Sequence, residues 1–464
     1  MIRKGLVSAA IAVLTLGSAV FADDLTTTST AAHNASASPA FSNNVFQVAA
    51  NPVLMDDQTA APSPAPAPTP AETPAPAATP AAAPAAAPAT PEAPLMWGLD
   101  QIGLAKPLND LHLSIGGYVE LGYLYNLTSP NVNNPPRSAP ANFILFPGDY
   151  QNQVMLNQLD LAIQRSVDAT QNKFDIGFDV EAFYGRDAVY THSNGILDNG
   201  NKHQKTSPDD DLDLEQAYLT FAIPVGSGLT VTAGKFATLL GNETINPTTN
   251  AFYSHSYIFS YGIPFTQTGV LAKYNITDSL TIDAGFTRGW NQSTSDNNSA
   301  IDFLGELVWT VNSKLTGTLN VSEGPQSAGD DHDYWTVLEA IGAYKVSDQL
   351  TLNADLLYGD ANAIAQWYAL AAYASYTFNS YVTANLRGEF YHDGRGFTTG
   401  VFVTDTNYFE VTAGLAVTPL PNYNLTSGLV IRPELRLDTA DRGVLDDGTK
   451  FTQVTAAIDA YWKF

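Results

Sequence analysis

Residues 111–125, LHLSIGGYVELGYLY, alternate apolar side chains with polar or small ones. On a helix these apolar residues would be scattered around the axis, whereas a period of two places them on one side of a strand. The same alternation returns later in the chain, for example at 159–164, 174–181, 280–286, 350–356 and 409–415. The chain from residue 111 onward is therefore predicted to be all-β.

The segments between these strands alternate in length. Tight turns at 277–279 and 312–314 contrast with long polar segments such as 186–210 and 439–450. Short turns at one end and long loops at the other are typical of an outer-membrane barrel, and strands of about ten residues suffice to span the membrane. We therefore predict a transmembrane antiparallel up-and-down β-barrel over residues 99–464, with both ends of the barrel on the short-turn side. The expected strands are 111–125, 153–166, 173–185, 211–224, 228–237, 265–276, 280–290, 300–310, 314–322, 334–345, 349–359, 367–377, 380–393, 408–418, 425–438 and 451–464, which is sixteen.

A water-soluble all-β array is the competing interpretation, and two features weigh against it. Aromatic residues fall near strand ends, where interface girdles would lie. The chain also stops inside its last strand, with Trp462 and Phe464 on the apolar face, like the C-terminal signal of bacterial outer-membrane proteins. The expected girdle residues are Tyr123, Tyr125, Tyr184, Trp290, Trp309, Trp335, Tyr344, Tyr358, Trp367 and Tyr376.

Three segments carry a family resemblance. They are 211–241 (DLDLEQAYLTFAIPVGSGLTVTAGKFATLLG), 251–274 (AFYSHSYIFSYGIPFTQTGVLAKY) and 285–298 (GFTRGWNQSTSDNN). They resemble the OmpL-like β-barrel porin family (β-barrel porin-2). The resemblance implies a single-chain outer-membrane barrel with pore activity, and it brings no active site or substrate with it.

If the apolar residues face lipid, the alternate residues face the lumen, and a barrel of 16 to 18 strands leaves an aqueous channel. An acidic wall opposite an arginine-bearing wall would set up a transverse field across the water. In the alternative interpretation, Arg387/Glu389 and Arg432/Glu434/Arg436 are cross-strand ion pairs that brace the barrel wall. Because acids outnumber bases among these positions, we expect a cation-preferring channel. The predicted pore-lining residues are Asp160, Asp175, Asp179, Glu181, Asp213, Glu215, Arg387, Glu389, Arg432, Glu434 and Arg436.

The segment 238–264 lies between the fifth and sixth expected strands. General sixteen-stranded porins fold a loop inward at this place, so by analogy this segment narrows the pore. An outward surface loop is an equal alternative. The sequence leaves the two open.

No enzyme motif is present. The seven histidines lie outside any zinc-protease spacing, and neither a G-x-S-x-G elbow nor a phosphate-binding glycine loop occurs. Acidic clusters at 209–211 and 330–333 offer carboxylates to Ca²⁺ or Mg²⁺, but they lack the EF-hand order, and solvated loops are favoured. We predict no enzymatic activity, no cofactor and no metal site.

The N-terminal part differs in composition from the rest. Arg3 and Lys4 precede an apolar run that ends at Ala22, which predicts a cleaved signal peptide over 1–22. Residues 23–98 are predicted to be a disordered linker, because proline recurs every few positions in APSPAPAPTPAETPAPAATPAAAPAAAPATPEAP (61–94). In the periplasm this linker would be a tether toward peptidoglycan or a protein partner.

The 464 residues include 46 acids, 21 bases and no cysteine, for a net charge of -25. The absence of cysteine excludes disulfides and thiolate chemistry, and the negative charge argues against a nucleic-acid partner. Residues 1–98 hold six acids and two bases, so 40 acids and 19 bases remain for the barrel.

Together these features predict an outer-membrane porin for passive diffusion of small hydrophilic solutes, with outer-membrane lipid and those solutes as partners. A structural or adhesive barrel is one alternative. Another is substrate-selective uptake, for example of sugars, aided by lumen aromatics such as Tyr118 and Tyr368. Sixteen-stranded porins are commonly trimers, although nothing in the sequence defines an interface.

Overall fold

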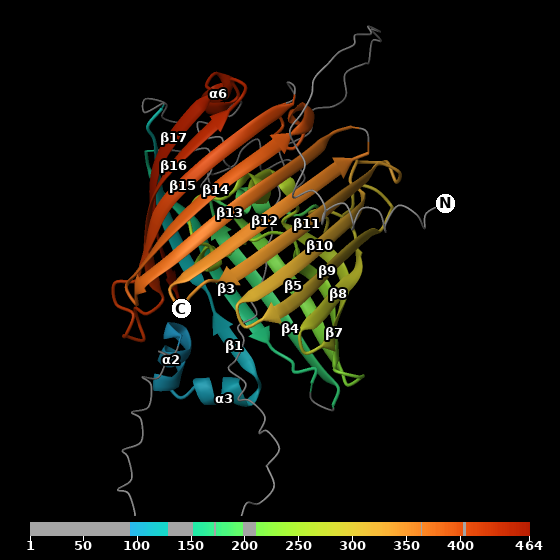
Figure 1. Ribbon diagram of the computed structural model, residues 1–464. Helices are drawn as coiled ribbons and strands as arrows, with labels where there is room; N and C mark the ends of the chain where they lie inside the picture. Colours follow the sequence, from blue (N-terminus) through green and yellow to red (C-terminus); the bar gives the residue numbers. More distant parts are fainter. Residues whose placement is uncertain (1–92, 129–151, 171–172, 198–209, 363, 402–404) are drawn as a thin grey trace, which may run out of the picture. The chain divides into compact units, whose positions relative to one another are not determined.

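The computed structural model describes residues 93–128, 152–170, 173–197, 210–362, 364–401 and 405–464. In these residues, strands β2 to β17 form a closed antiparallel barrel (Figure 1). Each strand pairs with the next along the chain, and β17 closes the ring by pairing with β2. The prediction of a sixteen-stranded up-and-down barrel is confirmed.

The observed strands follow the predicted ranges to within a few residues. The one predicted over 111–125 is divided at Gly117 into β1 and β2, which both pair with β3. The strands are β1 (Leu113–Gly116), β2 (Tyr118–Asn126), β3 (Val154–Arg165), β4 (Asp175–Gly185), β5 (Asp211–Ile223), β6 (Leu229–Ala237), β7 (Thr266–Thr277), β8 (Leu280–Thr287), β9 (Asp302–Asn312), β10 (Leu315–Pro325), β11 (Tyr334–Lys345), β12 (Leu350–Ala361), β13 (Gln366–Asn379), β14 (Val382–Asp393), β15 (Thr406–Val417), β16 (Leu429–Ala440) and β17 (Thr452–Lys463).

The seam of the barrel closes at Gly117. Its backbone N–H donates to the carbonyl of Phe464 at 3.1 Å, and the N–H of Phe464 donates back at 2.9 Å. A Cβ at this position would lie 2.2 Å from the carbonyl oxygen of Asp160, so only glycine fits there. The first and last strands therefore meet at one end of the barrel.

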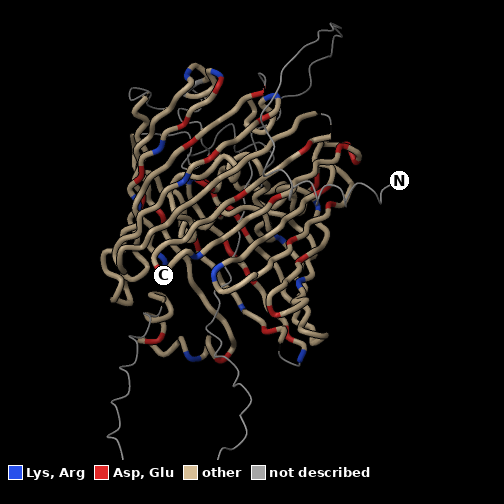
Figure 2. The backbone as a smooth tube through the Cα atoms, in the orientation of Figure 1, with Lys and Arg blue, Asp and Glu red and all other residues tan. Residues whose placement is uncertain are grey.

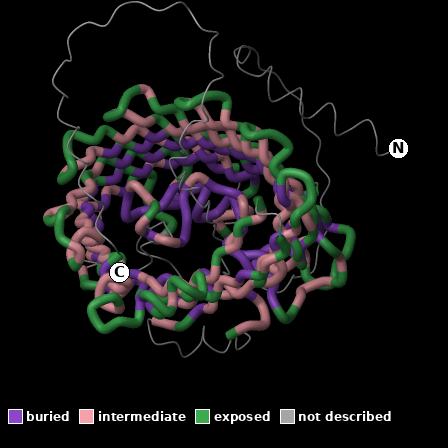
Figure 3. Tube along the Cα trace, turned by 90° about the horizontal axis from the view of Figure 1, so that it is seen from below, coloured by how far each residue is buried: buried purple, intermediate pink, exposed green. Residues whose placement is uncertain are grey.

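The two faces of the wall differ in polarity as the alternation predicts. On β3, Leu159 and Leu161 are exposed on the outer face, whereas Gln158 and Asp160 are buried on the inner face. Acidic and basic residues are distributed along the strands and their connections in Figure 2. Figure 3, which looks along the barrel, shows buried segments inside the ring and exposed ones around it. Lipid in the membrane would cover the outer apolar face.

The connections alternate in length. Those at 278–279, 313–314 and 380–381 are tight, whereas 238–265 and 288–301 are long. Short helices precede β1 or lie in the connections between strands. They are α2 (Pro94–Gln101), α3 (Ala105–Asp110), α4 (Ala188–Thr191), α6 (Leu445–Gly448), and the single-turn helices η2 (Pro247–Thr249), η3 (Ile258–Gly262) and η4 (Gly394–Gly396).

Helix α2 begins inside the segment predicted to be linker (23–98). The predicted signal peptide 1–22 and the rest of the predicted linker, up to residue 92, lie outside the described residues. None of the helices in the described part of the chain is long and apolar enough to cross a membrane.

The prediction of interface girdles is only partly right. Tyr184, Trp309, Tyr344, Tyr358 and Tyr376 are exposed on the outer face as expected. The other three tryptophans named for the girdle are not: Trp290 and Trp367 are buried, and Trp335 packs against them, with ring centroids 5.5 and 6.0 Å away. Closeness to a strand end did not decide the face: Trp335 is in phase with buried Val337 and Trp367 with buried Ala369, whereas Trp290 lies in a connection.

Candidate functional site in the barrel lumen

The connection between β6 and β7, residues 238–265, folds into the barrel, and we call it the inner loop. Leu240, Ile245 and Tyr257 in this loop are completely buried. Its hydrogen bonds run to inward side chains of β3 and of strands from β10 to β16. The structure thus favours the inward alternative over a surface loop.

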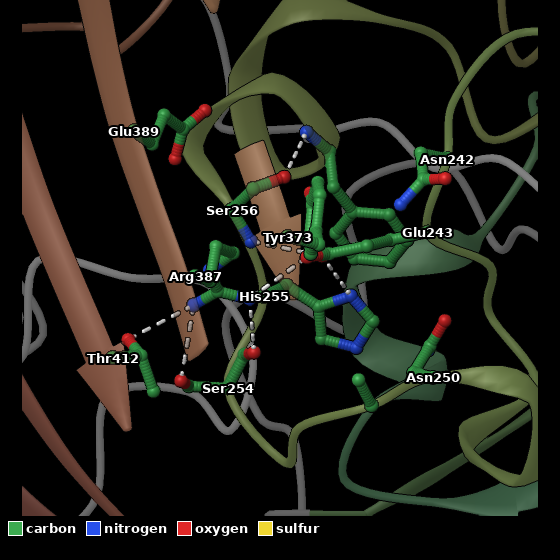
Figure 4. A network of polar contacts seen from close by, with 12 residues as sticks. Asn242, Glu243, Asn250, Ser254, His255, Ser256, Tyr373, Arg387, Glu389 and Thr412 are labelled. Carbon is green, nitrogen blue, oxygen red and sulfur yellow. Dashed lines mark hydrogen bonds and ion pairs between the residues drawn. The ribbon is translucent and has the colours of Figure 1, made fainter. Parts of the chain in front are cut away.

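Arg387 on β14 is the centre of this contact (Figure 4). Its Nη1 donates to Glu243 Oε1 and to the carbonyl of Ser254, both at 2.8 Å, and its Nε donates to Glu410 Oε1. Its Nη2 reaches Thr412 Oγ1 at 3.3 Å. The side chain is completely buried. One guanidinium therefore joins the inner loop to two strands of the wall.

Arg432 on β16 holds the first part of the loop. Its Nη1 donates to the carbonyls of Pro247 and Asn250 at 2.9 and 2.7 Å. Its Nη2 pairs with Asp459 at 2.6 Å and with Glu120 at 3.0 Å. The guanidinium charge is thus balanced by carboxylates of β17 and β2.

Arg436, four residues further along β16, repeats the arrangement. It pairs with Asp438 at 2.7 Å and donates to the carbonyl of His255. Tyr257 completes this contact, since its hydroxyl donates to Asp438 at 2.8 Å and its ring lies under the guanidinium. The three arginines therefore all bind both a wall carboxylate and the inner loop.

Carboxylates of the wall accept the backbone N–H groups that an irregular loop leaves without ladder partners. Glu389 accepts from Tyr257 and Ile258 at 2.6 and 2.8 Å, and Glu434 accepts from Tyr253 at 2.9 Å. On β11, Glu339 accepts from the backbone N–H of Gly241 at 2.8 Å. These bonds satisfy the loop inside the barrel without the solvent that a surface loop would use.

Glu243 and His255 lie in direct contact within the loop itself, with Nδ1 3.1 Å from Oε2. Burial would raise the pKa of Glu243, but Arg387 and His255 outweigh it and hold that pKa well below its usual range. Burial lowers the pKa of His255, and Glu243 offsets this only in part. At neutral pH the pair is therefore a neutral imidazole beside an ionised carboxylate.

Uncharged contacts fix the loop to β3. The hydroxyl of Tyr253 donates to Asn157 at 2.9 Å, and Gln158 donates to the carbonyl of Ile245 at 3.0 Å. Gly122 on β2 makes room for Tyr253, since a Cβ there would lie 2.0 Å from the hydroxyl. Strands β16, β17, β2 and β3 adjoin, so the inner loop lines a continuous part of the wall.

The structure places the eleven predicted pore-lining residues on the inner face, in two groups. Arg387, Glu389, Arg432, Glu434 and Arg436 contact the inner loop, as described above. The acids of β3 to β5 lie elsewhere on the wall. Of these, Asp175 pairs with Arg165 at 3.0 Å near a short turn, and Asp213 pairs with Lys235 at 3.4 Å. The remaining four, Asp160, Asp179, Glu181 and Glu215, have no ion pair among the described residues.

Cross-strand ion pairs of the wall do occur, with Arg387 bound to Glu410 and Arg432 to Asp459. Among the described residues, Arg387 does not pair with Glu389, and neither Arg432 nor Arg436 pairs with Glu434. Glu389 and Glu434 bind loop N–H groups, and the arginines pair with other acids. Those partners are Glu120, Glu243, Glu410, Asp438 and Asp459. Four of the five occupy inward positions between apolar outward neighbours, so the alternation could have identified them; Glu243 could not be found that way, because it lies in the loop.

The two lumen aromatics proposed for solute contact differ in position. Tyr118 is buried on the inner face, where its hydroxyl donates to Gln158 at 2.7 Å. Tyr368 is exposed on the outer face, in phase with Leu370. The expectation that Tyr368 lines the lumen is therefore wrong.

Comparisons with known proteins agree with this architecture. The outer membrane channel DcaP of Acinetobacter baumannii is similar in fold, with a TM-score of 0.51 at 14% identity, covering 76% of this chain and 97% of that one. OmpF of Salmonella typhi in complex with daunomycin gives 0.51 at 11% identity, covering 77% and 99%. An anion-selective porin from Comamonas acidovorans gives 0.50 at 11%, covering 76% and 99%. At these identities the likeness concerns the fold alone.

None of the curated proteins matches the sequence. A family model described as "Putative beta-barrel porin-2, OmpL-like" matches residues 112–464, which is the whole of the barrel. Family and fold together point to the bacterial outer membrane. With sixteen strands closed at Gly117 and Phe464 and a family match over the same residues, this chain belongs to the β-barrel porin-2, OmpL-like family.

Proposed function

We propose that this protein is a passive diffusion channel for small hydrophilic solutes, with a preference for cations and no enzymatic activity. The family and the sixteen-stranded barrel support the channel, because barrels of this size leave a water-filled lumen.

The distribution of charge inside the barrel carries the proposed cation preference. Each of Arg387, Arg432 and Arg436 is buried between a wall carboxylate and a carbonyl of the inner loop. Their positive charge is thus compensated locally and is covered by the loop. Asp160 and Glu215, on the wall of β3 and β5, have carboxylate oxygens without a partner. When they are ionised, these carboxylates give the lumen a negative charge that no described cation pairs with, which favours cations.

Reversal potentials test the preference. The refolded protein is inserted into a planar bilayer with a concentrated KCl solution on one side and a dilute one on the other. We expect a potential of the sign that K⁺ selectivity produces, and we expect it to shrink as the pH falls and the carboxylates become protonated. A potential of the opposite sign at neutral pH would overturn the preference, and a protein that inserts without conducting would overturn the channel.

Export and anchoring are further parts of the proposal. We propose that residues 1–22 are removed on export and that 23–92 reach from the barrel into the periplasm toward peptidoglycan. N-terminal sequencing of the protein from outer membranes tests the first, and equal recovery on peptidoglycan with and without 23–92 would refute the second. We also expect a homotrimer, which cross-linking in native membranes would detect.

A further inference from the structure

Four carboxylates lie close together on the inner wall formed by β3, β4 and β5. They are Asp160, Asp179, Glu181 and Glu215, which we call the acidic row. In the strand register Glu181 is opposite both Ala162 and Gln216, and Asp179 is opposite both Gln164 and Tyr218. Asp160 is the inward residue that precedes Ala162 on β3. The row is therefore a patch of neighbouring side chains on adjacent strands.

The acidic row has more acceptors than the described residues satisfy. Asp160 is 2% exposed, and neither of its carboxylate oxygens has a side-chain hydrogen-bond partner among the described residues. Glu215, also 2% exposed, has a free Oε2, and Asp179 has a free Oδ1. The neutral donors present reach only the other oxygens, with Gln216 on Glu181 and the hydroxyl of Tyr218 on Asp179.

Lys235 and the three lumen arginines form their ion pairs with acids outside the row, although the charge of Lys235 also acts on Glu215. Lys235 on the adjoining β6 lies 3.4 Å from Asp213 and donates to the carbonyl of Leu214. The three arginines hold the inner loop. A buried carboxylate without a donor or countercharge costs several kcal/mol. The acidic row can reduce this cost by taking up protons or by binding a cationic partner from outside the chain.

The spacing of the row indicates which cation fits. No group of three or more acidic or histidine side chains in the described residues is arranged to hold a metal ion. Carboxylates on neighbouring strands, about 4.8 Å apart, instead suit a cation with several N–H donors. A primary ammonium has three such donors and no acceptor, and its hydrogen bonds to carboxylates are charge-assisted.

Access to the row is graded along β3. Gln164, near the short-turn end, is exposed, and its neighbour Asp179 is partly exposed. Glu181 is 9% exposed and Asp160 only 2%. The row is thus open toward the short-turn half of the lumen and covered toward the other half. A cationic group entering from the short-turn side meets Asp179 first and Asp160 last.

We propose that the acidic row binds the primary ammonium group of an organic cation passing through the lumen. This inference rests on the proposed channel, and it identifies organic ammonium compounds as one class of solute that the channel retains during passage.

The test is block of the K⁺ current through single channels by 1,4-diaminobutane added on the short-turn side. We expect block in the wild-type protein and none with the uncharged 1,4-butanediol. Asp160→Asn and Glu215→Gln, which keep the side-chain shape, are each expected to weaken the block at least about tenfold, or roughly 1.4 kcal/mol. Asp283→Asn is the matched control, because Asp283 is a buried inward carboxylate on β8 that faces Lys273 across the strand pair.

Unchanged block by 1,4-diaminobutane in both row variants would overturn the inference. An equally weakened block in Asp283→Asn would also overturn it, because the block would then depend on the general negative charge of the lumen and not on the row. If the channel prefers K⁺ but its block does not depend on the row, the proposed channel stands and only this inference is refuted. If the channel prefers anions, the proposed cation preference is refuted. If the variants do not insert, calorimetric titration of the folded wild-type protein with 1,4-diaminobutane decides, and absence of binding refutes the site.

Discussion

Arg387 offers the sharpest test of how the inner loop is held in the lumen. The substitution Arg387→Met keeps most of the side-chain length but removes the guanidinium that binds Glu243, Glu410 and the carbonyl of Ser254. Both carboxylates are almost completely buried, at 5% and 2% exposure. Each of these two carboxylates would lose the guanidinium that pairs with it and would remain buried away from water.

Removing one partner of a buried ion pair costs about 3–5 kcal/mol. Two pairs depend on this one side chain, but Glu243 keeps His255 and Glu410 keeps the hydroxyl of Thr412. We therefore expect a loss of about 3–5 kcal/mol rather than twice that. Arg288→Met is the matched control, because Arg288 is 44% exposed and pairs with Asp296 at 3.3 Å. An exposed pair of this kind contributes about 0.2–1 kcal/mol.

Denaturant unfolding in detergent micelles, followed by tryptophan fluorescence, measures the free-energy difference. Glu243→Gln in the Arg387→Met background is expected to restore about 0.5–3 kcal/mol, since it removes one stranded charge. If the loop leaves the wall before the barrel unfolds, single-channel steps become larger and noisier instead. Arg387→Met with the stability of Arg288→Met and with unchanged current steps would refute the role assigned to Arg387.

Two further predictions concern the same loop. Because the pKa of His255 is lowered in the folded protein, the unfolded chain binds the proton first as the pH falls. The free energy of unfolding is therefore expected to fall as the pH drops from about 7 to 5. His255→Gln should flatten this part of the pH profile, and an unchanged slope would contradict the assignment. Gly122→Ala would place a methyl group against the Tyr253 hydroxyl and break its bond to Asn157, for a loss of about 1–3 kcal/mol. Gly342→Ala, where a Cβ meets nothing within 4 Å, is the control and is expected to be neutral or slightly stabilising; equal stability of the two variants would argue against close contact of the loop with β2.

Several parts of the architecture could be predicted from residues alone. Period-two alternation determined the strand positions, because a membrane wall must be apolar outside and can be polar inside. The inward placement of Asp160, Glu181 and Arg432 followed from the same rule. The girdle assignment of Trp335 and Trp367 failed because it relied on closeness to a strand end, whereas the alternation itself places both rings inward, in phase with Val337 and Ala369.

The ion-pair partners of the lumen arginines could not be predicted from the sequence. Arg387 and Glu389 are two residues apart and share a face, so mutual pairing was a reasonable expectation. Instead Arg387 binds Glu243, which is 144 residues away in the chain. Pairing of that range depends on where the loop enters the barrel, and local pattern holds no information on this.

The alternation of side chains by itself determined that this chain is a sixteen-stranded barrel and which residues face its lumen, because lipid imposes the same rule on every strand. Only the tertiary structure decided that 238–265 turns inward and engages the three arginines, since that depends on groups brought together from β2, β14, β15, β16 and β17. The same folding leaves carboxylate oxygens of Asp160 and Glu215 without a hydrogen-bond partner among the described residues. Which charges remain free in the lumen is therefore a property of the closed barrel with its loop in place.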